Sequence, residues 1–243
     1  NMKKQALLAA VALVAPVMLG TGVSADTTTA NTTPASAAQT TTPVISNFTV
    51  SSTDTNNPTP PSPTTPTTPG TPSSPNPGNV PLNPNGTFGL AYLPAQFNFG
   101  STELTGKTAV SATAQPETGK TFNVGVKDTT HTNKGWTLNA SLQGELTNYG
   151  AHIKITNTEA TLNNGGNLTS LPNSSMISVN NNIDINSVSS NIMTGNANGT
   201  VFSGTYDLKL GNVSLEIPNA SVVPAGDASG TVNWDLQQTP ANP

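Results

Sequence analysis

The sequence predicts an all-β protein: an antiparallel β-sandwich of Greek-key or immunoglobulin-like type, preceded by a disordered Thr/Pro-rich region. Three observations support this. After residue 85, short runs recur in which every second residue is apolar, as expected of half-buried strands. Clusters of Gly, Asn and Pro separate the runs, and such clusters form turns. No segment keeps apolar residues at helical spacing over three turns, so long helices are not expected.

Residues 1–25 have the pattern of a secretory signal peptide. Lys3 and Lys4 precede an apolar run over residues 6–19, and residues 23–25 read Val-Ser-Ala, a small-residue cleavage site. The run is shorter than the roughly 20 residues that a membrane-spanning helix needs. We therefore expect a secreted chain that starts at Asp26 and is not inserted in a membrane.

Residues 26–57 and 58–84 predict a disordered tail and an extended linker. Thr, Ser, Ala and Asn dominate the tail, which is too polar to form a core. Within it, Ile45 to Val50 either stays part of the tail, which is the favoured interpretation, or forms a strand that adds to the edge of a partner's sheet. In the linker, 11 of 27 positions are proline, which favours polyproline II geometry. The folded domain would then span residues 85–243.

The alternating runs give the expected strands of this domain in order. Residues 163–199 are rich in Asn and Gly and predict loops and short edge strands. The expected strands are Phe88 to Leu93, Phe97 to Phe99, Phe122 to Val126, Trp136 to Leu142, Ile153 to Ile155, Tyr206 to Leu210, Val213 to Ile217 and Val232 to Leu236.

The composition excludes several classes of site. Charged residues are only 8% of the chain, and cysteine and arginine are absent. Without cysteine there is no disulfide, thiolate metal site or Cys nucleophile. The formal net charge is −4, and it becomes −6 once the signal peptide takes Lys3 and Lys4 with it. An acidic chain without arginine is a poor partner for nucleic acid.

The two tryptophans of the chain share the pattern Trp-x-Leu, as Trp136 with Leu138 and Trp234 with Leu236. Residues two apart on a strand point the same way, so each pair lies on one apolar face opposite a polar face. Two interpretations follow. Either the indoles pack inside the sandwich, or they stack on a sugar of a ligand. The packing interpretation is favoured, with binding on neighbouring polar faces and loops.

Enzyme chemistry is not expected. The two histidines, His131 and His152, lie in no catalytic or metal-binding motif. The carboxylates show no local pairing of the kind that a glycoside hydrolase uses. We therefore assign no catalytic, cofactor-binding or metal-binding residues and no cofactor. Hydrolysis of a glycan is the least favoured function.

Four stretches of the sequence resemble the WxL-domain cell-surface proteins of low-GC Gram-positive bacteria. They are QFNFGS at 96–101, FNVGVKDTTHTNKGWTLNASL at 122–142, VFSGTYDLKLGNVSLEIPNAS at 201–221 and GTVNWDLQQTPAN at 230–242. The resemblance implies non-covalent attachment to the cell wall, with peptidoglycan as the ligand class. It also implies a membrane-anchored partner protein with immunoglobulin-like domains. One departure is Asp128-Thr129-Thr130-His131, where related sequences often have Asp followed by Asn-Arg-Gly; we expect Asp128 to form a turn.

Two functions from different classes remain open. In one, the domain itself binds peptidoglycan. In the other, it is a protein-interaction subunit docked on the membrane-anchored partner, which then binds the wall. A covalent link by sortase is not expected, because Leu93-Pro94-Ala95 and Leu171-Pro172-Asn173 both differ from Leu-Pro-x-Thr-Gly. Since the tail and linker hold no second domain, we expect the protein to be one component of a larger surface complex.

Overall fold

A computed structural model describes residues 40–64, 76–197 and 200–239. The chain divides into two units, Asn1–Phe48 and Thr49–Pro243. The predicted signal peptide lies outside the described residues, as do residues 26–39 of the predicted tail and 65–75 of the predicted linker. None of the helices among the described residues is long and apolar enough to span a membrane.

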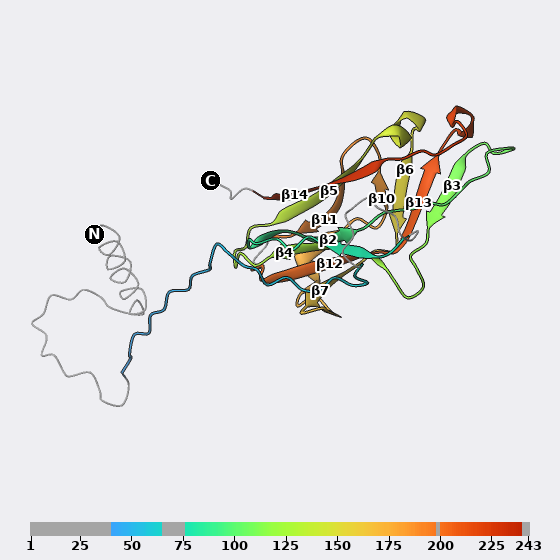
Figure 1. Ribbon diagram of the computed structural model, residues 1–243. Helices are drawn as coiled ribbons and strands as arrows, with labels where there is room; N and C mark the ends of the chain where they lie inside the picture. Colours follow the sequence, from blue (N-terminus) through green and yellow to red (C-terminus); the bar gives the residue numbers. More distant parts are fainter. Residues whose placement is uncertain (1–39, 65–75, 198–199, 240–243) are drawn as a thin grey trace, which may run out of the picture. The chain divides into compact units, whose positions relative to one another are not determined.

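The second unit is built of three antiparallel sheets, which confirms the all-β prediction (Figure 1). In strand order, sheet A contains β1 (Asn79–Pro81), β2 (Phe88–Pro94), β4 (Phe122–Asp128), β12 (Gly204–Leu210), β7 (Glu159–Asn164) and β8 (Asn167–Thr169). Sheet B contains β10 (Ile183–Ile185), β6 (His152–Thr156), β13 (Asn212–Ile217) and β3 (Val110–Ala114). Sheet C contains β14 (Thr231–Gln238), β5 (Trp136–Gln143), β11 (Ser190–Gly195) and β9 (Ile177–Val179).

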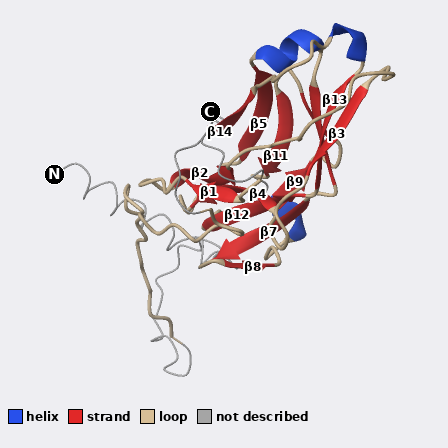
Figure 2. Cartoon of the chain, turned by 45° about the vertical axis from the view of Figure 1, so that its right-hand side comes forward, coloured by secondary structure: helices blue, strands red, loops and turns tan. Residues whose placement is uncertain are grey.

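The core lies between two layers. Figure 1 shows the strands of sheet A as one layer and those of sheets B and C as the other. A backbone hydrogen bond of 2.7 Å from Leu142 N to Asn186 O joins the end of β5 to the chain that leaves β10. Figure 2 shows the three short 3-10 helices beside the strands: η1 (Glu145–Tyr149), η2 (Ser174–Met176) and η3 (Ala220–Val222).

The period-two pattern explains why most expected strands form where they do. Along β5, buried and half-buried residues alternate strictly until the last position, as on a sheet with one face in the core. The expected strand Phe97 to Phe99 is the exception, because it pairs with no other strand. Instead the Asn76 side chain accepts from Asn98 N at 2.9 Å and donates to Asn98 O at 3.2 Å. Phe97 packs edge-on against Phe122, with ring centroids 5.1 Å apart.

A segment of the predicted tail and linker lies against the outer face of sheet A. We call residues 51–64 the strap. Within the strap, Asp54 N donates to Asn85 O at 2.9 Å, and Thr64 N donates to Asn79 O at 3.0 Å. Pro63 forms a parallel bridge with Asn79 of β1. Every residue of β4 is buried, because the core covers one face of this strand and the strap covers the other.

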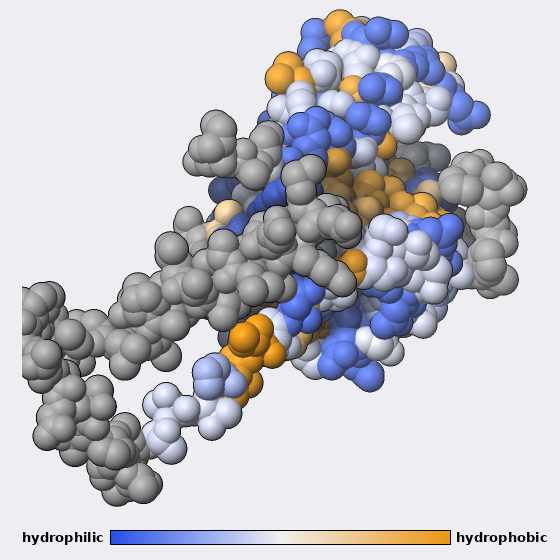
Figure 3. Space-filling model, turned by 90° about the vertical axis from the view of Figure 1, so that its left-hand side faces the viewer, coloured by the Kyte–Doolittle hydropathy of each residue, from blue (hydrophilic) through white to orange (hydrophobic). Residues whose placement is uncertain are grey.

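Residues 40–48, the described part of the first unit, form no strand or helix. Their apolar side chains are open to solvent, with exposed fractions of 91% for Val44, 68% for Ile45 and 92% for Phe48. Figure 3 shows apolar residues of this extended stretch in orange. Contiguous exposed apolar surface marks interaction sites, so this stretch is a candidate docking segment.

Candidate functional site

The two Trp-x-Leu motifs lie side by side on the antiparallel neighbours β5 and β14. Leu138 is directly opposite Leu236, while Trp234 is opposite Ala140 and Trp136 is opposite Gln238. Cross-strand partners point to the same side of a sheet, so both motifs face the core. The repeated pattern is thus one apolar patch made by two strands.

Trp136 is fully enclosed by the core. Its exposed fraction is 0%, and its ring lies 6.2 Å from that of Phe202 and 6.3 Å from that of Tyr206. Gly195 of β11 makes room for it, because a Cβ at that position would lie 2.4 Å from the indole. The indole Nε1 has no hydrogen-bond partner, so the side chain contributes by packing alone. In this conformation Trp136 and the fully buried Leu138 offer no accessible surface to a ligand.

Trp234 and Leu236 are only partly buried. Their strand, β14, pairs with β5 on one side and forms the edge of sheet C. Both side chains still pack against the core. The burial of the four motif residues therefore supports the packing interpretation.

The outer face of sheet A holds a buried polar cluster. Tyr92 Oη donates to Asp207 Oδ2 at 2.7 Å, and Asn123 Nδ2 donates to Asp207 Oδ1 at 2.8 Å. Asn163 Nδ2 donates to Tyr92 Oη at 3.2 Å. Burial raises the pKa of Asp207 to about 6, although the hydrogen bonds from Tyr92 and Asn123 act to lower it. Burial also raises the pKa of Tyr92, which therefore remains a proton donor to this carboxyl group.

The strap is held by side-chain donors from sheet A that bind its backbone carbonyls. Asn163 Nδ2 donates to Thr59 O at 2.9 Å, and Asn79 Nδ2 donates to Pro61 O at 2.7 Å. A proline-rich segment offers carbonyl acceptors but few N–H donors. A sheet surface that presents amide and ammonium donors is complementary to such a segment.

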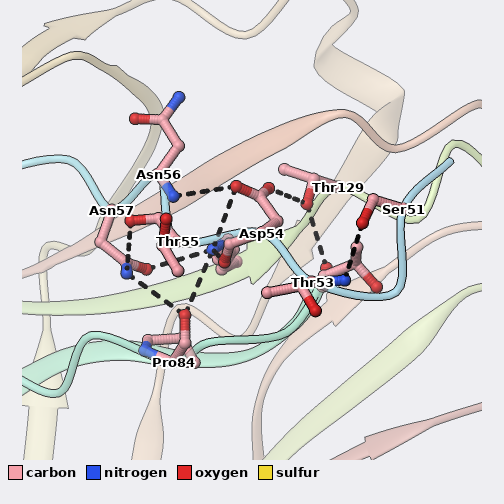
Figure 4. A network of polar contacts seen from close by, with 10 residues as sticks. Ser51, Thr53, Asp54, Thr55, Asn56, Asn57, Pro84 and Thr129 are labelled. Carbon is pink, nitrogen blue, oxygen red and sulfur yellow. Dashed lines mark hydrogen bonds and ion pairs between the residues drawn. The ribbon is translucent and has the colours of Figure 1, made fainter.

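Lys127 anchors the start of the strap. Figure 4 shows its partners Asp54, Asn57 and Pro84 together with Thr129. Its side chain is fully buried, and Nζ donates to the carbonyl oxygens of Asp54 and Pro84 and to Asn57 Oδ1. The Asp54 carboxylate lies 3.7 Å from Nζ and accepts a 2.6 Å hydrogen bond from Thr129 Oγ1. The hydrogen bond from Thr129, followed by that from the Asn56 backbone, lowers the pKa of Asp54.

The outer face of sheet B carries a second polar group, which we call the sheet B trough: His152, Lys154, Asp184 and Glu216. Asp184 is opposite Lys154, and Glu216 is opposite His152, so all four side chains point away from the core. Asp184 Oδ2 accepts from Lys154 Nζ at 2.6 Å, and Asp184 Oδ1 lies 2.8 Å from His152 Nδ1. Three of these residues border a shallow hollow of about 370 Å³. Its lining is Ala109, Val110, Ser111, His152, Lys154, Glu216, Ile217 and Pro218.

The comparison with protein families identifies this architecture. A family model described as "WxL domain surface cell wall-binding" matches residues 35–240. The chain belongs to the WxL domain family. No curated protein and no solved structure matches it. The WxL domain match includes the strap and residues 40–48, although the sequence-based domain boundary at residue 85 remains a prediction.

The described part of this WxL domain brings together no catalytic set. No group of three His, Cys, Asp or Glu residues that could hold a metal ion occurs among the described residues. His152 and Asp184 form a pair, but no hydrogen bond joins the second nitrogen of His152 to a serine in the described chain. The residues Asp128 and His131 do not form a triad either. As expected of a turn, Asp128 Oδ1 accepts from Thr130 N at 3.1 Å.

The sheet B trough and Lys127 were not among the candidate residues from sequence. A signal for the trough exists, because His152, Lys154 and Asp184 each stand between isoleucines or next to one. A charged residue that alternates with isoleucine marks the outer face of a strand. No comparable signal exists for Lys127, since its partners Asp54 and Asn57 lie about seventy residues earlier in a segment without periodicity.

Proposed function

We propose that the chain is a secreted, non-enzymatic surface protein, held non-covalently on the Gram-positive cell wall because its WxL domain binds peptidoglycan. The observation that carries this proposal is the family match over residues 35–240 to a surface cell wall-binding domain. The polar outer face of sheet B points away from the core that encloses Trp136, and it supports a binding role on that surface. The protein would act within a larger surface complex.

Sedimentation tests direct binding. The purified protein is mixed with cell walls stripped of their secondary polymers and centrifuged, and the pelleted fraction is measured against wall concentration. We expect saturable pelleting with no decrease in wall turbidity. Folded protein that stays in the supernatant would refute direct binding, and a loss of turbidity would refute the non-enzymatic assignment.

A second function is favoured by the exposed apolar stretch around Val44, Ile45 and Phe48. In this alternative the protein docks on a membrane-anchored partner that has immunoglobulin-like domains, by adding this stretch to the edge of a partner sheet. Replacing all three residues by serine separates the two functions. If attachment to intact cells is lost while pelleting with purified walls is unchanged, docking is the mode of attachment.

A further inference from the structure

The sheet B trough concentrates charge in a chain that has little of it. Only 8% of all residues are charged, yet Lys154, Asp184 and Glu216 lie with His152 on three neighbouring strands and point to the same side. The hollow beside them, at about 370 Å³, is within the usual size range of small-ligand sites, roughly 300–1,000 Å³. The charged side chains of the trough and a hollow of ligand size therefore lie at the same place on the surface.

Asp184 fixes the two basic side chains. Burial alone would raise its pKa, but the hydrogen bonds from Lys154 and His152 outweigh burial and lower it, so the carboxylate is ionised at neutral pH. An ionised carboxylate only accepts hydrogen bonds. The nitrogen facing it, His152 Nδ1, must therefore carry a proton.

The trough keeps binding capacity after these internal contacts. Lys154 Nζ has three donors, and its side chain remains 39% exposed. Glu216 is exposed and, among the described residues, forms no ion pair. The trough thus presents an ammonium group, an imidazole ring and a carboxylate beside the apolar lining residues Ile217 and Pro218.

We propose that the sheet B trough binds the stem peptide of peptidoglycan, a short peptide that carries both carboxylate and amine groups. Lys154 binds a carboxylate of the peptide, and Glu216 binds its free amine. The apolar lining accommodates the methyl groups of alanine. The proposal rests on the proposed function, because it names the part of the wall that the domain recognises.

The residues favour the peptide over the glycan strand as the ligand. Sugar rings are usually bound by exposed aromatic side chains, but none lines the hollow, and Trp136 is fully buried. The glycan presents uncharged hydroxyl and acetamido groups, whereas the trough presents opposite charges. Charge-assisted hydrogen bonds, which are stronger than neutral ones, would be used only by the peptide.

A calorimetric titration with a synthetic stem pentapeptide, which has a free lysine amine and a free C-terminal carboxylate, tests the site. We expect Lys154→Gln and Glu216→Gln each to weaken binding roughly tenfold or more. Lys134→Gln and Glu159→Gln, at exposed positions outside the lining of the hollow, are the matched controls and should bind like the wild type. Lys154→Gln should not weaken the binding of a pentapeptide whose carboxylate is amidated. Glu216→Gln should not weaken the binding of a pentapeptide whose amine is acetylated.

Wall sedimentation of the same variants separates the failure of this site from the failure of the proposed function. If the wild type pellets with walls but does not bind the pentapeptide, the ligand class is wrong. If it binds the pentapeptide but both trough variants match their controls, the site is wrong. In both cases wall binding still stands. A wild-type protein that neither pellets nor binds the peptide would overturn the proposed function and the trough together.

Discussion

At the scale of single residues, the two tryptophans of the repeated motif have unequal environments. Trp136 occupies space left by Gly195 and has no hydrogen-bond partner, whereas Trp234 lies half-buried on an edge strand. Truncation of a buried tryptophan costs about 3–5 kcal/mol, which is a large part of the stability of an ordinary domain. Loss of wall binding in a Trp136→Ala variant would therefore indicate that the domain has unfolded, not that the indole contacts the ligand.

Quenching by acrylamide distinguishes the two indoles. In Trp234→Phe the only remaining indole is Trp136, whose exposed fraction is 0%, so its fluorescence should be almost unquenched. In Trp136→Phe the remaining Trp234 should be quenched more strongly, because it is partly open to solvent. Wall binding per folded molecule should be unchanged in Trp234→Phe. Equal quenching of the two variants, each checked by circular dichroism, would contradict the buried position of Trp136.

The buried carboxyl group of Asp207 predicts a pH dependence of stability. Burial raises its pKa from 3.8 to about 6, so the folded protein holds this proton more tightly than the unfolded chain. The resulting stabilisation is fully present below pH 3.8 and is lost as the pH rises through about 6.

We expect Asp207→Asn to abolish this loss. The free energy of unfolding of the wild type, relative to that of the variant, should fall by about 2–3 kcal/mol between pH 4 and 7. Urea unfolding at a series of pH values measures the difference and cancels the opposite contributions of Asp54 and Asp184. A constant difference across this range would show that Asp207 titrates normally.

At the scale of strands, the sequence predicted the burial of each residue correctly where only one face of the strand is buried. In β5 the alternation of Trp136, Leu138 and Ala140 with polar residues matches the observed burial. In β4 the same alternation is present, but Asn123 and Lys127 on its polar face are buried too. The strap that covers them is proline-rich and has no periodicity. Alternation within a strand shows which residues face away from the core, but it does not show whether a distant segment of the chain buries them.

The same limit applies to the candidate site. The motif residues Trp136 and Trp234 could be found from sequence because the pattern repeats, and the period of two placed each Trp and Leu on one apolar face, which favoured packing over stacking on a ligand. The trough could not be assembled, because Asp184 and Lys154 meet only through the register between β10 and β6. Strand order is set by long-range pairing, which local alternation does not encode.

Lys127 should control whether the strap stays attached to sheet A. Lys127→Met removes the donor for the carbonyl oxygens of Asp54 and Pro84, and each unpaired buried acceptor costs about 1–3 kcal/mol. We expect proteases to cut within the strap of this variant several-fold faster than in the wild type. Lys107→Met, at an exposed position, is the control. If both variants are cut at the wild-type rate, the ammonium group does not hold the strap.

At the scale of the whole molecule, the question is where the cooperative unit begins. The sequence places the start of the domain at residue 85, whereas the strap and β1 bind sheet A from residues before it. A chain that starts at residue 85 loses β1, so that β2 becomes an edge strand. It also exposes the surface around Asn123, Lys127 and Asp207, which is fully buried in the intact protein.

We therefore expect the chain 40–243 to be more stable than 85–243 by several kcal/mol, because burial and hydrogen bonds of the strap add to the free energy of unfolding. The chain 76–243, which keeps β1 but lacks the strap, should have intermediate stability. Urea unfolding followed by circular dichroism measures the order of stability, and tryptophan fluorescence from sheet C shows whether loss of the strap weakens the distant layer.

Equal midpoints for all three chains would place the start of the domain at residue 85 and reduce the strap to a tail that rests on the surface. A lower midpoint for both shortened chains, seen by both probes, would make the strap part of one cooperative fold and would require any wall-binding test to use a chain that contains it.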